Sequence, residues 1–411
     1  MKKNISIWQM LVLNAYWVGL SFMWNALHPI ILPAVLLNFI PDVRKNTYLG
    51  LLTFVGLIIA MIIQPLSGAL SDGWASRWGR RRPLIVLGTL FDFLFLALLG
   101  WAGGLTWLFI GYVGLQFSSN VAHGPLQGLL PDRVPANQLG AASALKTFMD
   151  MFSLIIASLL AGRLLDAKTR DAALIMLVVM GVLAFSAVIT ILGTPEEPTH
   201  DRQRLDFHGF FDLFRIDFRA NISYWWLIAE RGLFLLGIFG VQAFAQYYLQ
   251  DVIKVPDPPK QTGDLMAALT IGLVVLVLVG GWLTDRFGAK RIIYIASFIS
   301  TIGMLSMLMA HDMSGLTIMG SLLGAGIGLF LTANWALANA LAPSEEAGKY
   351  LGLTNLATAG SGALARLEGP VLDALNNYAP GEWMGYKAMF IFGAACILIS
   401  VILLRRIKIP D

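Results

Sequence analysis

Long apolar stretches separated by short polar segments run through the whole sequence. Twelve of them have about the length that an α-helix needs to cross ~30 Å of hydrocarbon at ~1.5 Å per residue. Several contain Gly or Pro, which membrane helices tolerate where neighbours satisfy the freed backbone groups. The pattern predicts an all-α integral membrane protein with twelve transmembrane helices, at residues 8–37, 48–72, 83–102, 105–131, 140–163, 172–194, 223–249, 264–284, 291–310, 315–341, 350–377 and 384–404.

The composition excludes other classes of protein. Of the 411 residues, 57% are hydrophobic and 13% are charged, against roughly 45–50% and ~25% in soluble domains. A soluble fold could not bury that much apolar surface, and disorder requires the opposite composition. The single cysteine, Cys396, excludes an intramolecular disulfide and a Cys/His metal site. We expect no cleaved leader, because the first apolar stretch is too long for one.

The Lys and Arg residues predict the orientation in the membrane. With the N-terminus inside, the cytoplasmic segments carry 18 of the 29 Lys and Arg residues, and the external loops carry 8. Cytoplasmic loops hold such an excess in membrane proteins. We therefore expect a multi-pass protein of the plasma (cytoplasmic) membrane with both termini in the cytoplasm. This distribution accounts for the net charge of +4, so the charge does not indicate a nucleic-acid partner.

The two halves of the chain repeat each other. The polar stretch 194–221 predicts an N-terminal six-helix bundle (1–194), a cytoplasmic linker (195–222) and a C-terminal six-helix bundle (223–411). Gly68-Ala-Leu-Ser-Asp72 is echoed 213 positions later by Gly281-Trp-Leu-Thr-Asp285, and Leu139-Gly140 is echoed 212 positions later. Two echoes at nearly one offset predict two pseudo-symmetric bundles, the architecture of transporters with a site between the halves.

The loop after the second span of each half resembles the signature of the major facilitator superfamily. In the first copy, Gln64-Pro-Leu-Ser-Gly68 and Ser76-Arg-Trp-Gly-Arg-Arg-Arg-Pro83 look like the loop of sucrose transporters and the related glycoside–pentoside–hexuronide:cation symporters. Gly124-Pro-Leu-Gln-Gly-Leu-Leu-Pro-Asp132 is similar to a stretch closing the fourth span in that group. The resemblance implies a secondary transporter that works by alternating access.

Both copies of the loop place a carboxylate beside basic residues at the end of a span. Such a carboxylate can pair with guanidinium groups or with the N-terminus of the next helix, in a contact made when the inner side is closed. In the alternative interpretation the basic residues contact anionic lipid headgroups. The candidate gating residues are Asp72, Arg77, Arg80, Arg81, Asp285, Arg286 and Lys290.

Three charged residues inside the predicted spans are candidates for ion coupling. An ionisable group near the bilayer centre costs at least ~2.5–3.5 kcal/mol, so it needs a partner or a function. Asp92 lies near the middle of the third span, and Lys146 and Asp150 lie one turn apart in the fifth, where they can pair. Each carboxylate is either a protonatable coupling group or part of a structural contact.

The chain departs from its relatives at the positions that would couple an ion. The cation-coupled sugar symporters carry acids in the second span, where this chain has Ala60 and Gln64. The sucrose transporters carry an Asp in the fourth span, where this chain has Gln116. Because none of these side chains titrates, coupling to a proton or sodium either has moved to Asp92 or Asp150 or is absent.

Two further spans contain charged residues. Glu230 and Arg231 are adjacent in the seventh span, so they point ~100° apart and do not pair directly. Arg366 and Glu368 lie in the eleventh span just before Gly369-Pro370, where we expect the helix to break. These two form either a polar lining or a clamp between helices.

A sugar site needs aromatic faces together with neutral hydrogen-bonding groups. Asn14, Trp17, Ser21 and Asn25 share one face of the first span, at i, i+3, i+7 and i+11, which favours a face directed into the bundle. A single Asn more often packs helices than binds a ligand, so the argument depends on the whole set. The candidate substrate-binding residues are Asn14, Trp17, Ser21, Asn25, Gln116, Asn120, Arg231, Gln242, Asn334 and Asn355.

The sequence contains no motif of an enzyme, a nucleotide site or a metal site. We therefore expect no cofactor, no catalysis and no ATP-driven transport. The expected partners are the lipid bilayer and a small polar solute, a sugar or glycoside, with or without a proton or sodium, and the expected state is a monomer. Two alternatives stay open: an efflux carrier for amphipathic molecules, and a non-transporting assembly or pigment-handling protein on the same scaffold.

Overall fold

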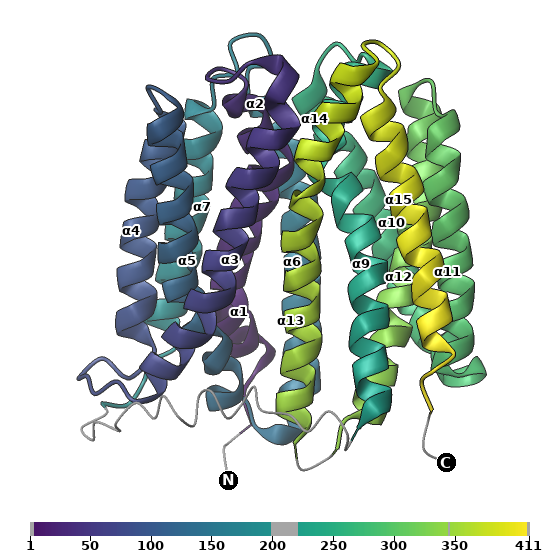
Figure 1. Cartoon of the computed structure of the whole chain (residues 1–411). Helices are drawn as coiled ribbons and strands as arrows, with labels where there is room; N and C mark the ends of the chain where they lie inside the picture. The colour runs from purple at the N-terminus through teal and green to yellow at the C-terminus, as the bar shows by residue number, and fades with distance from the viewer. Residues whose placement is uncertain (1–3, 199–220, 344–345, 409–411) are drawn as a thin grey trace. The chain divides into compact units, whose positions relative to one another are not determined.

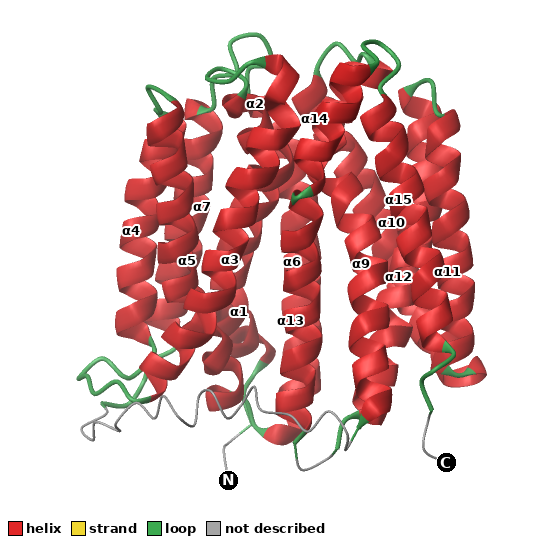
Figure 2. Cartoon of the chain, in the orientation of Figure 1, coloured by secondary structure: helices red, strands yellow, loops and turns green. Residues whose placement is uncertain are grey.

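The structure is a computed structural model, and it describes residues 4–198, 221–343 and 346–408. These residues are almost entirely helical, and they contain no strand (Figures 1 and 2). Each predicted span corresponds to one helix or to consecutive helices, so the predicted all-α fold is confirmed. Ten helices of the described residues are long and apolar enough to cross a membrane. The fourth span does not qualify because polar residues run through its middle. The eleventh is divided into a helix of 20 residues that is rich in Gly, Thr and charged groups and a helix of 11 residues that is too short.

The chain forms two compact units, of which the first contains Met1–Ile40 and Val55–Phe210. Its described helices follow each other along the chain and run side by side (Figure 1). They are α1 (Ile7–Ala26), a π-helical turn (Leu27–Ile31), α2 (Leu32–Leu36), most of α3 (Lys45–Asp72), α4 (Arg82–Gly100), α5 (Leu105–Arg133), α6 (Leu139–Leu164) and α7 (Ala173–Gly193).

The second unit contains Phe211–Asp411 and also Pro41–Phe54, so α3 is divided between the units. The sequence did not predict this division. Most of the predicted linker 195–222 lies outside the described residues. The helices of this unit are α9 (Ile222–Tyr248), a π-helical turn (Leu249–Ile253), α10 (Pro258–Phe287), α11 (Ala289–Ser306), α12 (Met313–Leu341), α13 (Ala347–Arg366), α14 (Glu368–Tyr378) and α15 (Met384–Leu404).

Prolines explain where two spans are interrupted. Pro29 and Pro33 remove backbone donors in the first span, where the π-helical turn Leu27–Ile31 interrupts the α-helix. The eleventh span breaks at Leu367, not at Gly369-Pro370 as predicted. Pro370 instead lies in the first turn of α14, where a missing N–H is tolerated because it has no partner within the helix.

Close helix contacts and an apolar surface characterise both units. A Cβ on Gly237 of α9 would lie 2.5 Å from the carbonyl oxygen of Gly393 on α15, and a Cβ on Gly88 of α4 would lie 2.6 Å from the carbonyl oxygen of Ser118 on α5. Small residues allow membrane helices to approach this closely. Large apolar side chains remain exposed, as Phe185 at 71%, which suits surfaces that face lipid.

Candidate functional site

The first polar cluster joins α1, α5 and α6 in the first unit. Lys146 Nζ donates to Asp150 Oδ2 at 2.8 Å, and Ser21 Oγ donates to Asp150 Oδ1 at 3.2 Å. The Lys146 ammonium lies 3.7 Å from the centroid of the Trp17 ring, and His123 meets that ring edge-on at 4.9 Å. The cluster therefore offers an aromatic ring, a cation and a carboxylate that already has two donors.

A second cluster in the same unit is formed by polar and aromatic groups of α1, the π-helical turn after it and α5. The His28 Nε2 atom lies 2.9 Å from the Tyr112 hydroxyl, and Gln116 Nε2 donates to the same hydroxyl at 2.7 Å. Trp24 stacks on His28 with ring centroids 4.9 Å apart. Asn120 Nδ2 lies 3.4 Å from Gln116 Oε1. Sequence reasoning missed Tyr112, because a lone Tyr in an apolar span gives no signal.

Three of the predicted substrate-binding residues of the first unit donate their side-chain amides to backbone carbonyls. Asn120 Nδ2 donates to the carbonyl of Gln116 at 2.7 Å. Asn14 is fully buried and donates to the backbone carbonyl of Ala142 at 3.2 Å, so it joins α1 to α6. Asn25 donates to the carbonyl of Ser21 one turn earlier at 2.8 Å. Trp17, Ser21, Gln116 and Asn120 are the predicted residues that lie in the two clusters.

Asp92 lies in the interface between α4 and α5. It is fully buried and accepts a hydrogen bond from Ser118 Oγ at 2.5 Å. Its second carboxylate oxygen is buried and has no hydrogen-bond partner among the described residues. Asp92 is therefore separate from the hydrogen-bonded groups of Lys146 and Asp150, and the structure does not bring the three predicted coupling residues together.

The loop between α3 and α4 forms a charged cluster. Asp72 forms an ion pair with the Arg81 guanidinium, which also donates to Asp132 at 3.0 Å and to the Ser71 hydroxyl at 2.5 Å. Arg80 donates to Asp132 at 2.7 Å. Burial alone would lower the pKa of Arg80, but the hydrogen bond and charge of Asp132 outweigh it and raise that pKa. Two carboxylates thus hold two of the predicted gating arginines.

Glu196 anchors the same loop from beyond α7. Its carboxylate accepts hydrogen bonds from the backbone N–H of Arg81 at 2.9 Å and of Arg82 at 3.3 Å. Gly79 has a φ of +92°, and a Cβ there would overlap the Glu196 side chain. The predicted gating residue Arg77 lies apart, with its guanidinium 5.7 Å from the Trp78 ring. Glu196 was assigned to the linker in sequence, so its contact was not foreseen.

The second copy of the loop, after α10, is organised differently. Asp285 and Arg286 are exposed, and the Arg286 guanidinium lies 5.3 Å from the Trp282 ring. Lys290 donates to the carbonyl of Ile407 at 2.7 Å. In the described part of the chain, no ion pair joins Asp285 to either basic residue. The repeat in sequence therefore does not extend to the ion pair that Asp72 makes.

A buried polar network links α9, α12 and α13 in the second unit. Asn334 accepts from Arg231 Nη1 at 2.6 Å and donates to Glu230 at 2.7 Å. Arg231 Nε donates to the Thr358 hydroxyl at 3.0 Å. Glu230 and Arg231 are bridged through Asn334, which agrees with the expectation that they do not pair directly. Thr358 was missed, because a Thr inside a helix commonly bonds its own backbone.

Two predicted residues of the second unit lie outside this network. Gln242 and Asn355 are exposed, and within the described ranges neither makes a hydrogen bond to the Arg231–Asn334 pair. On α13 it is the Thr358 hydroxyl, and not Asn355, that accepts a hydrogen bond from Arg231. No cluster of His, Cys, Asp and Glu that could hold a metal ion occurs among the described residues.

Sequence comparisons identify the family of the chain. The profile of the Major Facilitator Superfamily matches residues 9–366 and 258–410. The "Uncharacterized symporter YnaJ" of Bacillus subtilis is 26% identical over 63% of this chain and 58% of its own length. The Arabidopsis thaliana "Sucrose transport protein SUC4" is 27% identical over 28% of this chain and 25% of its own length. Mouse "Solute carrier family 45 member 3" is 31% identical over 21% of this chain and 18% of its own length.

Solved structures match over nearly the whole chain. A bacterial homologue of the human lysosomal transporter Spinster has a TM-score of 0.77 at 16% identity and covers 98% of both chains. The nucleoside transporter NupG has a TM-score of 0.74 at 13% identity and covers 97% of this chain and 99% of its own. These identities establish the fold alone. With the family profile matching most of its length, the chain belongs to the Major Facilitator Superfamily and is a multi-pass membrane protein.

Proposed function

We propose that this protein is a secondary transporter that moves a small polar solute, a sugar or glycoside, across the plasma membrane by alternating access. The observation that carries the proposal is the pair of clusters in the first unit. The Trp17 ring contacts His123 and Lys146. The Trp24 ring stacks on His28, whose Nε2 lies 2.9 Å from the Tyr112 hydroxyl. A sugar presents an apolar ring face and several hydroxyl groups, so it needs this combination of aromatic faces and polar groups.

The names of some relatives support the same substrate class. A sucrose transport protein and a protein named as a symporter match parts of the chain. The Arg231–Asn334 network would add a charged, hydrogen-bonding surface on the second unit. An efflux carrier for amphipathic molecules would need fewer groups of this kind, and a non-transporting protein would not need the ion-paired loop after α3.

Asp150 is the coupling carboxylate in this proposal. Loss of its charge by protonation would weaken the contact with Lys146, which is 2.8 Å long, and would free that ammonium for the solute. The exposed fractions of the two side chains, 26% for Lys146 and 20% for Asp150, leave both within reach of water. Asp92 is fully buried, so it is the weaker candidate.

Uptake into proteoliposomes tests the proposal. A panel of mono- and disaccharides and glycosides is offered with and without an imposed proton or sodium gradient. We expect saturable uptake of at least one sugar and gradient-driven accumulation of it. If no sugar is taken up and amphipathic compounds are, the result contradicts the proposal and favours the efflux carrier.

The Asp150→Asn variant tests the coupling role. We expect it to abolish gradient-driven accumulation and to leave counterflow exchange intact, because exchange needs no net movement of the ion. Asp92→Asn is the matched control and should retain accumulation. Loss of both accumulation and exchange in Asp150→Asn, or of neither, contradicts the assignment.

A further inference from the structure

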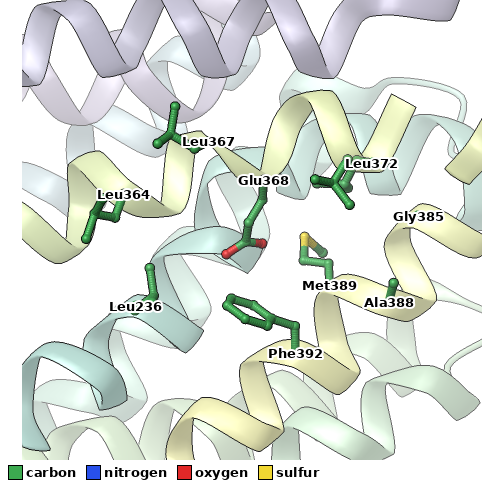
Figure 3. A pocket seen from close by; sticks show the side chains of 10 residues that line it. Leu236, Leu364, Leu367, Glu368, Leu372, Gly385, Ala388, Met389 and Phe392 are labelled. Atoms are coloured by element: carbon green, nitrogen blue, oxygen red, sulfur yellow. The ribbon is translucent and has the colours of Figure 1, made fainter. Parts of the chain in front are cut away.

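A pocket of ≈530 Å³ lies in the second unit, between α9, the junction of α13 with α14, and α15 (Figure 3). Leu236, Leu364, Met389 and Phe392 contribute to its walls. Among the described residues that line it, Glu368 is the one charged side chain. The pocket is therefore an apolar space with a single carboxylate, unlike the polar clusters described above.

The Glu368 carboxylate points into this pocket. Figure 3 shows it directed into the space between Leu236, Met389 and Phe392. Both of its oxygens are buried, and neither has a hydrogen-bond partner among the described residues. Arg366 acts on it electrostatically without donating a hydrogen bond to it. A buried carboxylate without hydrogen bonds is costly unless it meets a cation or a proton.

The backbone of α9 is shaped around this carboxylate. A Cβ on Gly240 would overlap the Glu368 carboxylate, so the carboxylate occupies the space where any larger residue would have its side chain. Packing against Gly240 thus fixes one side of the carboxylate and leaves the other side open to the pocket. The charge is held where a ligand in the pocket would meet it.

The position of the pocket selects ligands that dissolve in hydrocarbon. Glu368 lies ten residues before Tyr378, the last residue of α14, which is about 15 Å along a helix and near the middle of a ~30 Å hydrocarbon layer. Leu364 and Val371 on the pocket wall are 55% and 57% exposed. An inorganic cation would find no further side-chain oxygen among the described lining residues, whereas an apolar body would fit these walls.

We propose that this pocket binds amphipathic organic cations, each with one ammonium or phosphonium centre on an apolar body, and that Glu368 supplies the counter-charge. The volume lies within the range of ~300–1,000 Å³ that is typical of small-molecule sites. The pocket shares no lining residue with the clusters assigned to the polar solute, and the proposal does not depend on sugar being that solute.

Binding of two ions of the same shape and opposite charge tests the proposal. Purified full-length protein in nanodiscs is titrated with tetraphenylphosphonium and with tetraphenylborate. We expect saturable binding of the phosphonium, with weaker binding of the borate. Glu368→Gln should weaken phosphonium binding by about tenfold or more, as expected for losing one charged contact. Glu382→Gln, at an exposed carboxylate, is the matched control and should bind as the wild type does.

A second variant separates charge from volume. Ala388→Phe fills the pocket and keeps Glu368, so it should also reduce phosphonium binding. Size-exclusion chromatography shows whether each variant folds. If Glu368→Gln does not fold, Ala388→Phe still tests the proposal. Equal affinity for the two ions, or unchanged phosphonium binding in either folded variant, would overturn the proposal.

Discussion

Replacing Lys45 by methionine would leave a buried carboxylate without its cation. Lys45, at the start of α3, groups with the second unit, and its Nζ lies 2.6 Å from Asp251 Oδ1. The side chains of Lys45 and Asp251 are 3% and 6% exposed. Tyr386 donates a hydrogen bond to the other Asp251 oxygen at 2.8 Å. Asp42 also contacts Lys45 at 3.1 Å, but it is 69% exposed and contributes little.

The cost of this substitution follows from the geometry. At 2.6 Å and an effective dielectric constant of ~20, the attraction is about 6 kcal/mol. Removing both ions from water costs several kcal/mol each, so the pair as a whole contributes little. Removing one partner leaves the other unpaired and costs about 3–5 kcal/mol. The double variant Lys45→Met/Asp251→Leu should therefore recover most of the stability lost by Lys45→Met.

Thermal unfolding of the purified protein, followed by tryptophan fluorescence, measures this effect. For a unit of about 200 residues, a loss of about 3–5 kcal/mol lowers Tm by roughly 6–20 °C. Lys387→Met is the matched control, because the Lys387–Glu382 contact is 3.4 Å long and exposed. It should change stability by less than about 0.5 kcal/mol.

The double-mutant cycle decides whether the reasoning is correct. A coupling free energy below about 0.5 kcal/mol between Lys45 and Asp251 would show that the pair is not buried as described. A double variant no more stable than Lys45→Met would show that the loss comes from packing and not from the unpaired charge.

Three further substitutions test the loop after α3 and the buried network. Gly79→Ala should destabilise the protein by about 1–2 kcal/mol or more, because φ is +92° and the new Cβ meets Glu196; an unchanged Tm would contradict this. Asn334→Ala removes the hydrogen bond to Glu230 and should lower the free energy of unfolding by about 1–3 kcal/mol. An unchanged Tm in thermal unfolding would contradict a stabilising role of Asn334. Asp72→Asn removes the charge that pairs with Arg81 and should change the labelling of cysteines introduced in the loop after α3. Unchanged labelling would contradict the gating role of Asp72.

The length of the apolar stretches was sufficient to predict the helices, because the lipid phase leaves few alternatives to a helix. The same argument could not locate the break in the eleventh span. A Gly-Pro pair is a strong signal, but Pro370 fits the first turn of a helix as well as it fits a break. The sequence alone does not distinguish the two outcomes, and the structure places the break at Leu367.

Contacts within one helix could be predicted where charge and spacing coincide. Lys146 and Asp150 are one turn apart, so their contact follows from helix geometry alone. Contacts between distant segments were missed: Glu196 accepts from the backbone of Arg81, and Lys45 pairs with Asp251. Charged residues at the ends of spans are ordinary in membrane proteins, so nothing in sequence distinguishes a buried pair from solvated charges.

The division of α3 links these contacts to the proposed transport cycle. Lys45–Phe54 belongs to the second unit and Val55–Asp72 to the first, although they are one helix. Asp373 accepts from Asn46 Nδ2 at 2.8 Å and from the Thr47 backbone N–H at 2.6 Å, which adds to the Lys45–Asp251 pair. If the two units move against each other, either α3 bends near Phe54 or these contacts break. Lys45→Met then lowers stability in both cases, but it changes the rate of solute exchange only if breaking them is part of the cycle.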